Sequence, residues 1–138
     1  MSEFRQDLVS GDWIIIAPER ARRPHELVSG KKKRILPSKR GCPFEHPEKT
    51  GNWPPVFAYP TEKNWEFVVI PNKFPALTHA AGCAKTSHVV PYTIVSGTGR
   101  HDLLVTRDHL KNFAELTLAK ATRVFQAFQK RHQMLAED

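Results

Sequence analysis

Three arginines lie close together directly after a stretch that predicts a strand. Trp13 to Ile16 is an unbroken run of β-favouring apolar residues, and we expect it to be a strand buried on both faces. Pro18 ends the run, and the arginines Arg20, Arg22 and Arg23 follow it. Guanidinium groups pair with phosphate oxygens in bidentate geometry, so this cluster is a candidate phosphate-binding site. A solvated basic loop is the alternative that the spacing leaves open.

A cysteine, an acid and a distant histidine form a second set of candidate residues. Cys42 and Glu45 have the spacing of two metal ligands in one short turn. The alternative is a half-buried cysteine beside a surface acid. His101 begins a predicted strand over residues 101–105 and His109 follows its end, where a histidine can reach a neighbouring loop as a metal ligand. A structural or solvated histidine is again the alternative.

Several catalytic motifs are absent from the sequence. It contains no nucleophile elbow, no Walker-type phosphate loop and no dinucleotide fingerprint. None of the seven histidines lies in a His-x-His segment. Covalent nucleotidyl transfer through histidine needs an imidazole oriented by its neighbours, so we expect this chain alone not to catalyse such a transfer.

Composition favours one cytoplasmic domain. The chain has 138 residues, 40% of them hydrophobic, and no apolar run approaches the ~20 residues of a membrane span. Two cysteines imply no disulfide framework, and the N-terminus lacks the apolar segment of a signal peptide. Part of the net charge of +7 comes from a basic run between Lys31 and Arg40. No aromatic residues interleave these charges, so we favour a solvated loop over a nucleic-acid site.

The predicted elements give an α+β fold. Strands are expected over residues 65–70 and 101–105, with a weaker strand over 89–95 that Pro91 interrupts. Apolar residues at helical spacing predict a helix over residues 117–134, with Thr117 as its N-cap. We expect a mostly antiparallel, half-barrel-like sheet with this helix packed on one face.

The helix is predicted to be amphipathic. The apolar residues expected to face the sheet are Leu118, Ala121, Val124, Phe125, Phe128 and Leu135. The cations expected on the opposite side are Lys120, Arg123, Lys130 and Arg131.

Ordered motifs along the chain resemble the galactose-1-phosphate uridylyltransferase family, a branch of the histidine-triad superfamily. They are Leu-Val-Ser-Gly-Asp-Trp-Ile-Ile-Ile-Ala-Pro-Glu-Arg-Ala-Arg-Arg-Pro at 8–24, Cys-Pro-Phe-Glu at 42–45, Val-Ile-Pro-Asn-Lys-Phe-Pro-Ala-Leu at 69–77, and Gly-Arg-His-Asp-Leu-Leu-Val-Thr-Arg-Asp-His at 99–109. The resemblance covers the whole chain, residues 1–138, as the incomplete N-terminal domain of such a protein. The family's nucleophilic histidine and fourth zinc ligand lie downstream of the matched motifs.

The resemblance implies roles for individual residues. Arg20 and Arg23 match the arginines that bind the nucleotide's phosphates, and Phe44 matches an apolar side chain that covers the base. Asn72 and Lys73 match the pair at the uridine and its ribose.

The resemblance also implies a zinc site with an incomplete set of ligands. Cys42, Glu45 and His109 match three of the family's four ligands, but Glu45 stands where the family has a second cysteine. A carboxylate in place of a thiolate makes a harder site, so zinc is an uncertain cofactor here.

The implied reaction is uridylyl transfer in galactose metabolism, in which UDP-glucose and galactose 1-phosphate give UDP-galactose and glucose 1-phosphate. The alternatives are an adenylyl-transferring relative and a non-catalytic nucleotide- or phosphate-binding module. The expected partners are a UDP-sugar and a sugar 1-phosphate, without membrane or nucleic acid. A second copy or a separate C-terminal half would be the protein partner.

Overall fold

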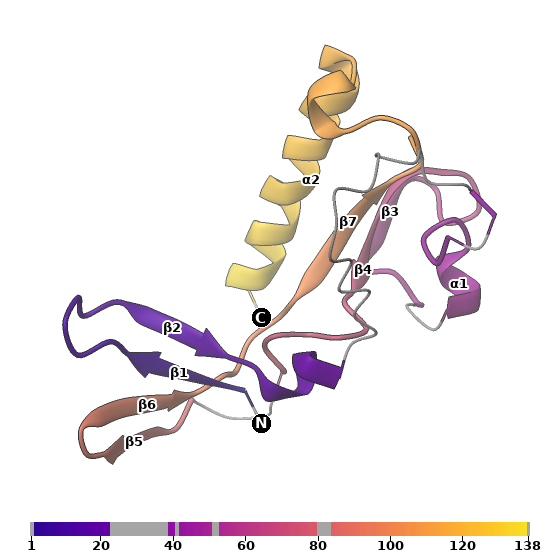
Figure 1. Cartoon of the computed structure of the whole chain (residues 1–138). Helices are drawn as coiled ribbons and strands as arrows, with labels where there is room; N and C mark the ends of the chain where they lie inside the picture. Colours follow the sequence, from indigo (N-terminus) through magenta and orange to yellow (C-terminus); the bar gives the residue numbers. More distant parts are fainter. Residues whose placement is uncertain (1, 23–38, 41, 51–52, 80–83, 138) are drawn as a thin grey trace, which may run out of the picture.

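The computed structural model describes residues 2–22, 39–40, 42–50, 53–79 and 84–137, and these form two antiparallel sheets and one long helix (Figure 1). The first sheet has the strand order β2-β1-β6-β5 and the second the order β3-β4-β7. The first comprises β1 Glu3–Gln6, β2 Trp13–Ile16, β5 Thr86–Val89 and β6 Tyr92–Ser96. The second comprises β3 Phe57–Pro60, β4 Trp65–Pro71 and β7 Asp102–Thr106. The predicted α+β class is confirmed, and the described strands form no closed barrel.

Strand β4 is the centre of the second sheet and supplies most of the core. Val68 and Ile70 are fully buried on one face, together with Trp65. Phe67 and Val69 are buried on the other face, where α2 packs. Successive side chains of a strand point to opposite faces, so both faces of this central strand need cover. The predicted strand over residues 65–70 is therefore confirmed.

Helix α2 Leu118–Ala136 lies along one face of this sheet (Figure 1). Thr117 caps it, because its side-chain oxygen accepts the backbone N–H of Lys120 at 3.4 Å. The helix forms where it was predicted, but the face that packs on the sheet differs from the prediction. Its buried residues are Val124 and Ala127, whereas Leu118, Phe125, Phe128 and Leu135 are exposed.

Three of the helix cations point at the sheet rather than away from it. Lys120 pairs with Asp108 at 2.7 Å, Arg123 with Glu66 at 2.8 Å and Arg131 with Asp102 at 2.7 Å. Their long aliphatic stems lie over the sheet while their charged ends reach carboxylates at its rim. The predicted division into an apolar inner face and a basic outer face is therefore wrong.

Strand β2 exists where it was predicted, but it is not buried on both faces. It pairs with β1 and is an edge strand of the first sheet. The exposed fractions of Trp13, Ile14 and Ile15 are 47%, 50% and 46%. An apolar run of four residues does not distinguish a central strand from an edge strand, which explains the wrong prediction.

The segment predicted as one weak strand over residues 89–95 is instead a hairpin. Strands β5 and β6 pair antiparallel, with Val89 opposite Tyr92, so Val90 and Pro91 form the turn. After β6 the chain passes to β7 through Gly97, whose N–H donates to the carbonyl of Ser2 at 2.8 Å. A Cβ at Gly97 would lie 2.7 Å from that carbonyl, so only glycine allows this contact.

Three short helical turns complete the described fold: η1 Pro18–Arg22, α1 Pro47–Thr50 and η2 Phe113–Glu115. No helix in the described part of the chain combines the length and apolar character needed to cross a membrane.

Candidate functional site

Arg20 lies in η1, the 3-10 turn that follows β2. Its Nη1 donates to the carbonyl oxygen of Phe74 at 3.1 Å, which ties η1 to a loop 54 residues further along the chain. A cavity of about 270 Å³ lies at this contact. It is lined by Ser2, Glu19, Arg20, Lys73, Phe74, Pro75 and Thr78. The structure therefore brings together two residues of the predicted nucleotide site, Arg20 and Lys73.

The 72–76 loop that carries Lys73 is held by short hydrogen bonds. Asn72 Oδ1 accepts the backbone N–H of Phe74 at 3.0 Å, which forms an Asx turn. Lys73 Nζ donates to the carbonyl of Thr50 at 3.3 Å, so the loop also contacts the end of α1. Because Asn72 uses its oxygen to shape the turn, it positions its neighbours Lys73 and Phe74 at the cavity.

His101 fixes both ends of the same loop. Its Nδ1 accepts the backbone N–H of Ala76 at 2.9 Å, and its carbonyl oxygen accepts the N–H of Asn72 at 2.9 Å. Its Nε2 lies 3.1 Å from Nδ2 of Asn72. The bond accepted by Nδ1 and the bond accepted by the carbonyl oxygen hold the two ends of the loop, which gives His101 a positioning role. The sequence showed His101 at the start of a strand but gave no sign of this contact.

Glu45 and His109, two of the predicted zinc ligands, come together in space. Nδ1 of His109 lies 3.4 Å from Oε2 of Glu45, and both side chains are largely buried. Arg107, two residues before His109, donates from Nη1 to the backbone carbonyl of Glu45 at 3.2 Å. The segment that follows β7 therefore holds the turn that contains Glu45. Sequence reasoning missed this contact because nothing in the motif at 99–109 marks Arg107 as a contact residue.

Cys42 begins the same turn, since its carbonyl accepts the N–H of Glu45 at 3.2 Å, and it is a free, half-buried cysteine. Among the described residues, no three His, Cys, Asp or Glu side chains are arranged to hold a metal ion. The described donors thus do not complete a zinc site. Zinc binding stays a prediction.

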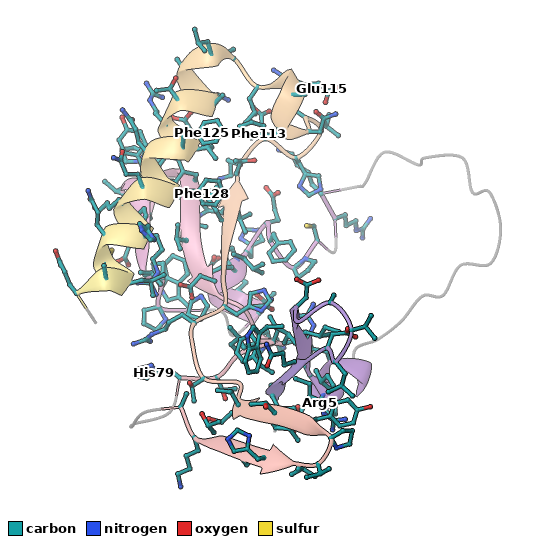
Figure 2. All side chains as sticks on the ribbon, turned by 90° about the vertical axis from the view of Figure 1, so that its left-hand side faces the viewer. Arg5, His79, Phe113, Glu115, Phe125 and Phe128 are labelled. Atoms are coloured by element: carbon teal, nitrogen blue, oxygen red, sulfur yellow. The ribbon has the colours of Figure 1, made fainter. Side chains whose placement is uncertain are left out.

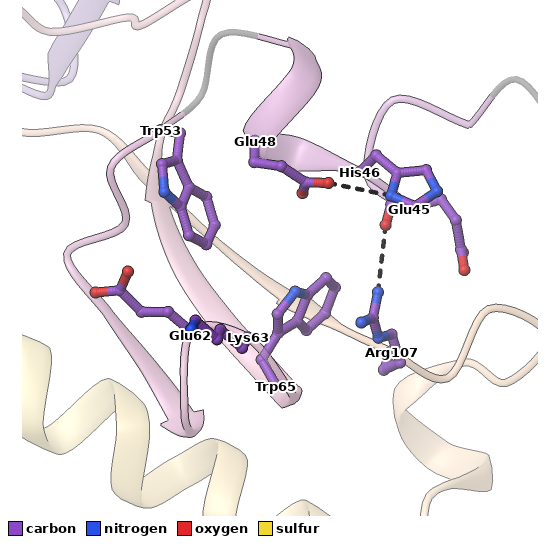
Figure 3. Close-up of a pocket in the computed structure, with 8 residues that line it drawn as sticks. All are labelled: Glu45, His46, Glu48, Trp53, Glu62, Lys63, Trp65 and Arg107. Carbon is purple, nitrogen blue, oxygen red and sulfur yellow. Dashed lines mark hydrogen bonds and ion pairs between the residues drawn. The ribbon is translucent and has the colours of Figure 1, made fainter.

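A larger cavity of about 550 Å³ lies on the other side of the Glu45 turn (Figure 3). It is lined by Glu45, His46, Glu48, Trp53, Glu62, Lys63, Trp65 and Arg107. Arg107 is already stacked on Trp65, 4.1 Å from the ring centroid, and the lining has three acidic residues against the two cations Lys63 and Arg107. The smaller cavity has one acidic residue, Glu19, against Arg20 and Lys73, so the balance of charge there suits a phosphate group better.

Two further predicted site residues, Phe44 and Arg23, are not among the described residues of the Arg20 cavity. Phe44 is 37% exposed and is not in the lining of the Arg20 cavity. Arg23 lies outside the described residues, as do Lys31 to Arg34 of the basic run.

Comparison with known proteins gives one relative and no family model. The chain is 28% identical over 141 residues to ADP-glucose phosphorylase of Arabidopsis thaliana. The match covers 98% of this chain but 39% of that protein. No family model and no solved structure matches the chain. The chain is therefore a distant relative of an enzyme named for its action on a sugar nucleotide, and it spans well under half of that enzyme's length.

Proposed function

We propose that this chain binds the diphosphate of a nucleoside diphosphate sugar in the Arg20 cavity, as the donor-binding part of a nucleotidyl-transferring enzyme. The single observation that supports this most strongly is that Arg20 and Lys73, far apart in sequence, line one cavity. A guanidinium binds a phosphate through a planar fork, and an ammonium adds a point charge beside it.

The hydrogen bonds around the cavity favour a preformed site. The Arg20 guanidinium is oriented by the carbonyl of Phe74, and the 72–76 loop is held by Asn72 and His101. Groups that are ordered before the ligand arrives lose less conformational entropy when it binds.

The relative favours adenosine over uridine in the donor. The uridylyl reaction was predicted from motif resemblance alone, whereas the matched protein is named as an ADP-glucose phosphorylase. We therefore propose an ADP-sugar as the preferred ligand, and UDP-glucose with galactose 1-phosphate as the competing substrate pair.

Isothermal titration of the chain with ADP-glucose, UDP-glucose and glucose 1-phosphate tests the proposal. Saturable binding of ADP-glucose, tighter than that of glucose 1-phosphate and weakened by Lys73→Ala, is the expected result. Tighter binding of UDP-glucose would support the binding site but would show that the preferred donor contains uridine rather than adenosine. Equal, weak binding of all three ligands would contradict the site itself.

A further inference from the structure

Strand β4 is irregular near its first residue, and this irregularity places Trp65 beside the larger cavity. The pairing of β3 with β4 shifts register between Tyr59 and Pro60. Such a bulge can turn a neighbouring side chain to the other face of the sheet, and Trp65 lies in the core cluster with Val68. Helix α2 covers the opposite face of this sheet, as Figure 1 and Figure 2 show. We call the cavity of about 550 Å³ on the Trp65 side the Trp65 cavity.

The indole N–H of Trp65 is a buried donor that no described group accepts. Trp65 is 5% exposed and lies under Arg107, but within the described part of the chain its Nε1 has no hydrogen-bond partner. Figure 3 shows this nitrogen on the side of the ring that faces the cavity. A buried indole N–H usually has an acceptor, because burying a donor without one costs free energy. The Trp65 N–H is therefore available to a ligand in the cavity.

Trp53 supplies an aromatic wall across the cavity from Trp65 (Figure 3). Its ring is half-buried and packs against the core cluster, which holds it in place. A flat indole ring packs well against the C–H groups of a ligand. Because the core already orders this side chain, little conformational entropy is lost when a ligand binds there.

One acid and one cation at the rim of the cavity are free to meet a ligand. Glu62 and Lys63 are exposed, and neither side chain has an ion pair or hydrogen bond with a described residue. Two other acids of the lining are engaged, since Glu48 pairs with His46 at 3.1 Å and Glu45 pairs with the histidine after β7. The rim thus offers one free acceptor and one free donor.

These groups select against three classes of ligand. An anion meets three acidic residues in the lining, against two cations. An organic cation has no acceptor for the Trp65 N–H, and it meets Lys63 and Arg107. An apolar ligand leaves the buried N–H without a partner.

A neutral sugar fits the same groups. Each hydroxyl of a sugar both donates and accepts hydrogen bonds, so it can serve an indole N–H, a carboxylate and an ammonium. The C–H groups of a pyranose ring form an apolar face that packs on an indole. The volume of the Trp65 cavity also lies within the range of roughly 300–1,000 Å³ that is typical of small-molecule sites.

We propose that the Trp65 cavity binds a neutral hexose or hexose disaccharide. The sugar ring lies on Trp53, one hydroxyl oxygen accepts the N–H of Trp65, and another hydroxyl donates to Glu62. Lys63 donates to a further hydroxyl oxygen. This site is separate from the Arg20 cavity, because the two cavities share no described lining residue. It does not depend on the proposed nucleotide site.

Proton–nitrogen correlation NMR tests the proposal, because each of the three tryptophans gives one indole N–H signal. Titration with glucose, maltose and cellobiose should move the Trp65 signal until it saturates with at least one sugar, as its N–H gains an acceptor. Trp13, which lies in β2, is the internal control, and its signal should stay in place. A Trp65 signal that none of the sugars moves, or that tetramethylammonium moves and the sugars do not, would overturn the proposal.

Variants at the rim test the contacts without disturbing the core. Glu62→Ala and Lys63→Ala should each raise the dissociation constant of the sugar about tenfold, as for a charge-assisted hydrogen bond. The matched control is Glu137→Ala, which changes an exposed acid after α2 and should bind as the unmodified chain does. Lys73→Ala should leave sugar binding unchanged, which separates this site from the Arg20 cavity. Equal sugar affinity in the two rim variants and the control would contradict the site.

Discussion

Arg20 is oriented by a backbone carbonyl rather than by an acid. Its Nη1 donates to the carbonyl oxygen of Phe74, and this neutral acceptor orients the guanidinium without cancelling its charge. A charged group held by a neutral acceptor keeps its attraction for an anion. We therefore expect the geometry of the fork, and not only its charge, to contribute to phosphate binding.

Replacing Arg20 with lysine separates these contributions. Arg20→Lys keeps the charge but loses the planar fork, so the affinity for ADP-glucose should fall by about 1–3 kcal/mol, as for charge-assisted hydrogen bonds. Isothermal titration measures the change. Arg5→Lys, a substitution in β1 outside the cavity lining, is the control and should bind as the unmodified chain does. Unchanged affinity in the Arg20 variant would remove this residue from the site.

His101 offers a test of loop positioning. In His101→Ala the N–H of Ala76 loses its acceptor, so hydrogen exchange at Ala76 should quicken and ADP-glucose should bind more weakly. His101→Asn places an amide oxygen near the position of Nδ1 and should recover part of the protection. If exchange at Ala76 is the same in His101→Ala as in the unmodified chain, the ring does not hold this loop.

The sequence predicted the types of the site residues better than their arrangement. Arg20 was assigned to phosphate from its chemistry and from motif resemblance, and Lys73 was assigned to the uridine and its ribose from the resemblance alone. These two residues do line one cavity. The hydrogen bonds of His101 and Arg107 were not predicted, because each joins segments 25 to 62 residues apart and leaves no local pattern.

At the scale of elements, the ion pair between Asp108 and Lys120 ties the start of α2 to the segment after β7. The hydrogen bond from Lys120 lowers the pKa of the Asp108 carboxyl below its usual range. The same bond raises the pKa of Lys120 above its usual range. Both groups are charged between about pH 4 and pH 10, where the pair stabilises the folded chain.

The pH dependence of this pair follows from the two shifts. Because the folded pKa of Asp108 is lowered, its contribution is present above about pH 4 and is lost as the pH falls through the folded value. The melting temperature of Asp108→Asn should therefore lie below that of the unmodified chain at pH 7, and the difference should shrink in acid. Thermal melts of both proteins from pH 2 to pH 8 measure it. An Asp12→Asn control should show no such trend, and a difference that grows in acid would contradict the assignment.

The sequence predicted which segments are helices and strands, but it did not predict which of their side chains are buried. The period of apolar residues predicted α2, but the same period allowed Phe125 and Phe128 either to face the sheet or to avoid it. In the structure the face that packs on the sheet carries Lys120, Arg123 and Arg131, which make ion pairs there. The carboxylates that make these pairs lie on other strands and loops, so a pattern within the helix does not reveal them.

We expect the whole chain to bind a sugar nucleotide without catalysing nucleotidyl transfer. The sequence has no His-x-His segment, and His101 is engaged by the 72–76 loop, so we expect no exchange of label between glucose 1-phosphate and a sugar nucleotide. The measurement uses radiolabelled glucose 1-phosphate with ADP-glucose or UDP-glucose, and protein made in a host without such transferases. Exchange that copurifies with the chain would show that one of its own histidines is a nucleophile.

The position of Ser2 has a practical consequence for reagents made from this protein. Its side chain is buried, its carbonyl is held by Gly97, and the residue forms part of the wall of the Arg20 cavity. An affinity tag or fluorescent fusion at the N-terminus would start beside the cavity at which we propose that a nucleotide binds. If Arg20 and Lys73 bind the diphosphate as proposed, a tag with acidic residues there would compete with the ligand for them. Binding assays should therefore use protein whose N-terminal tag has been cleaved off.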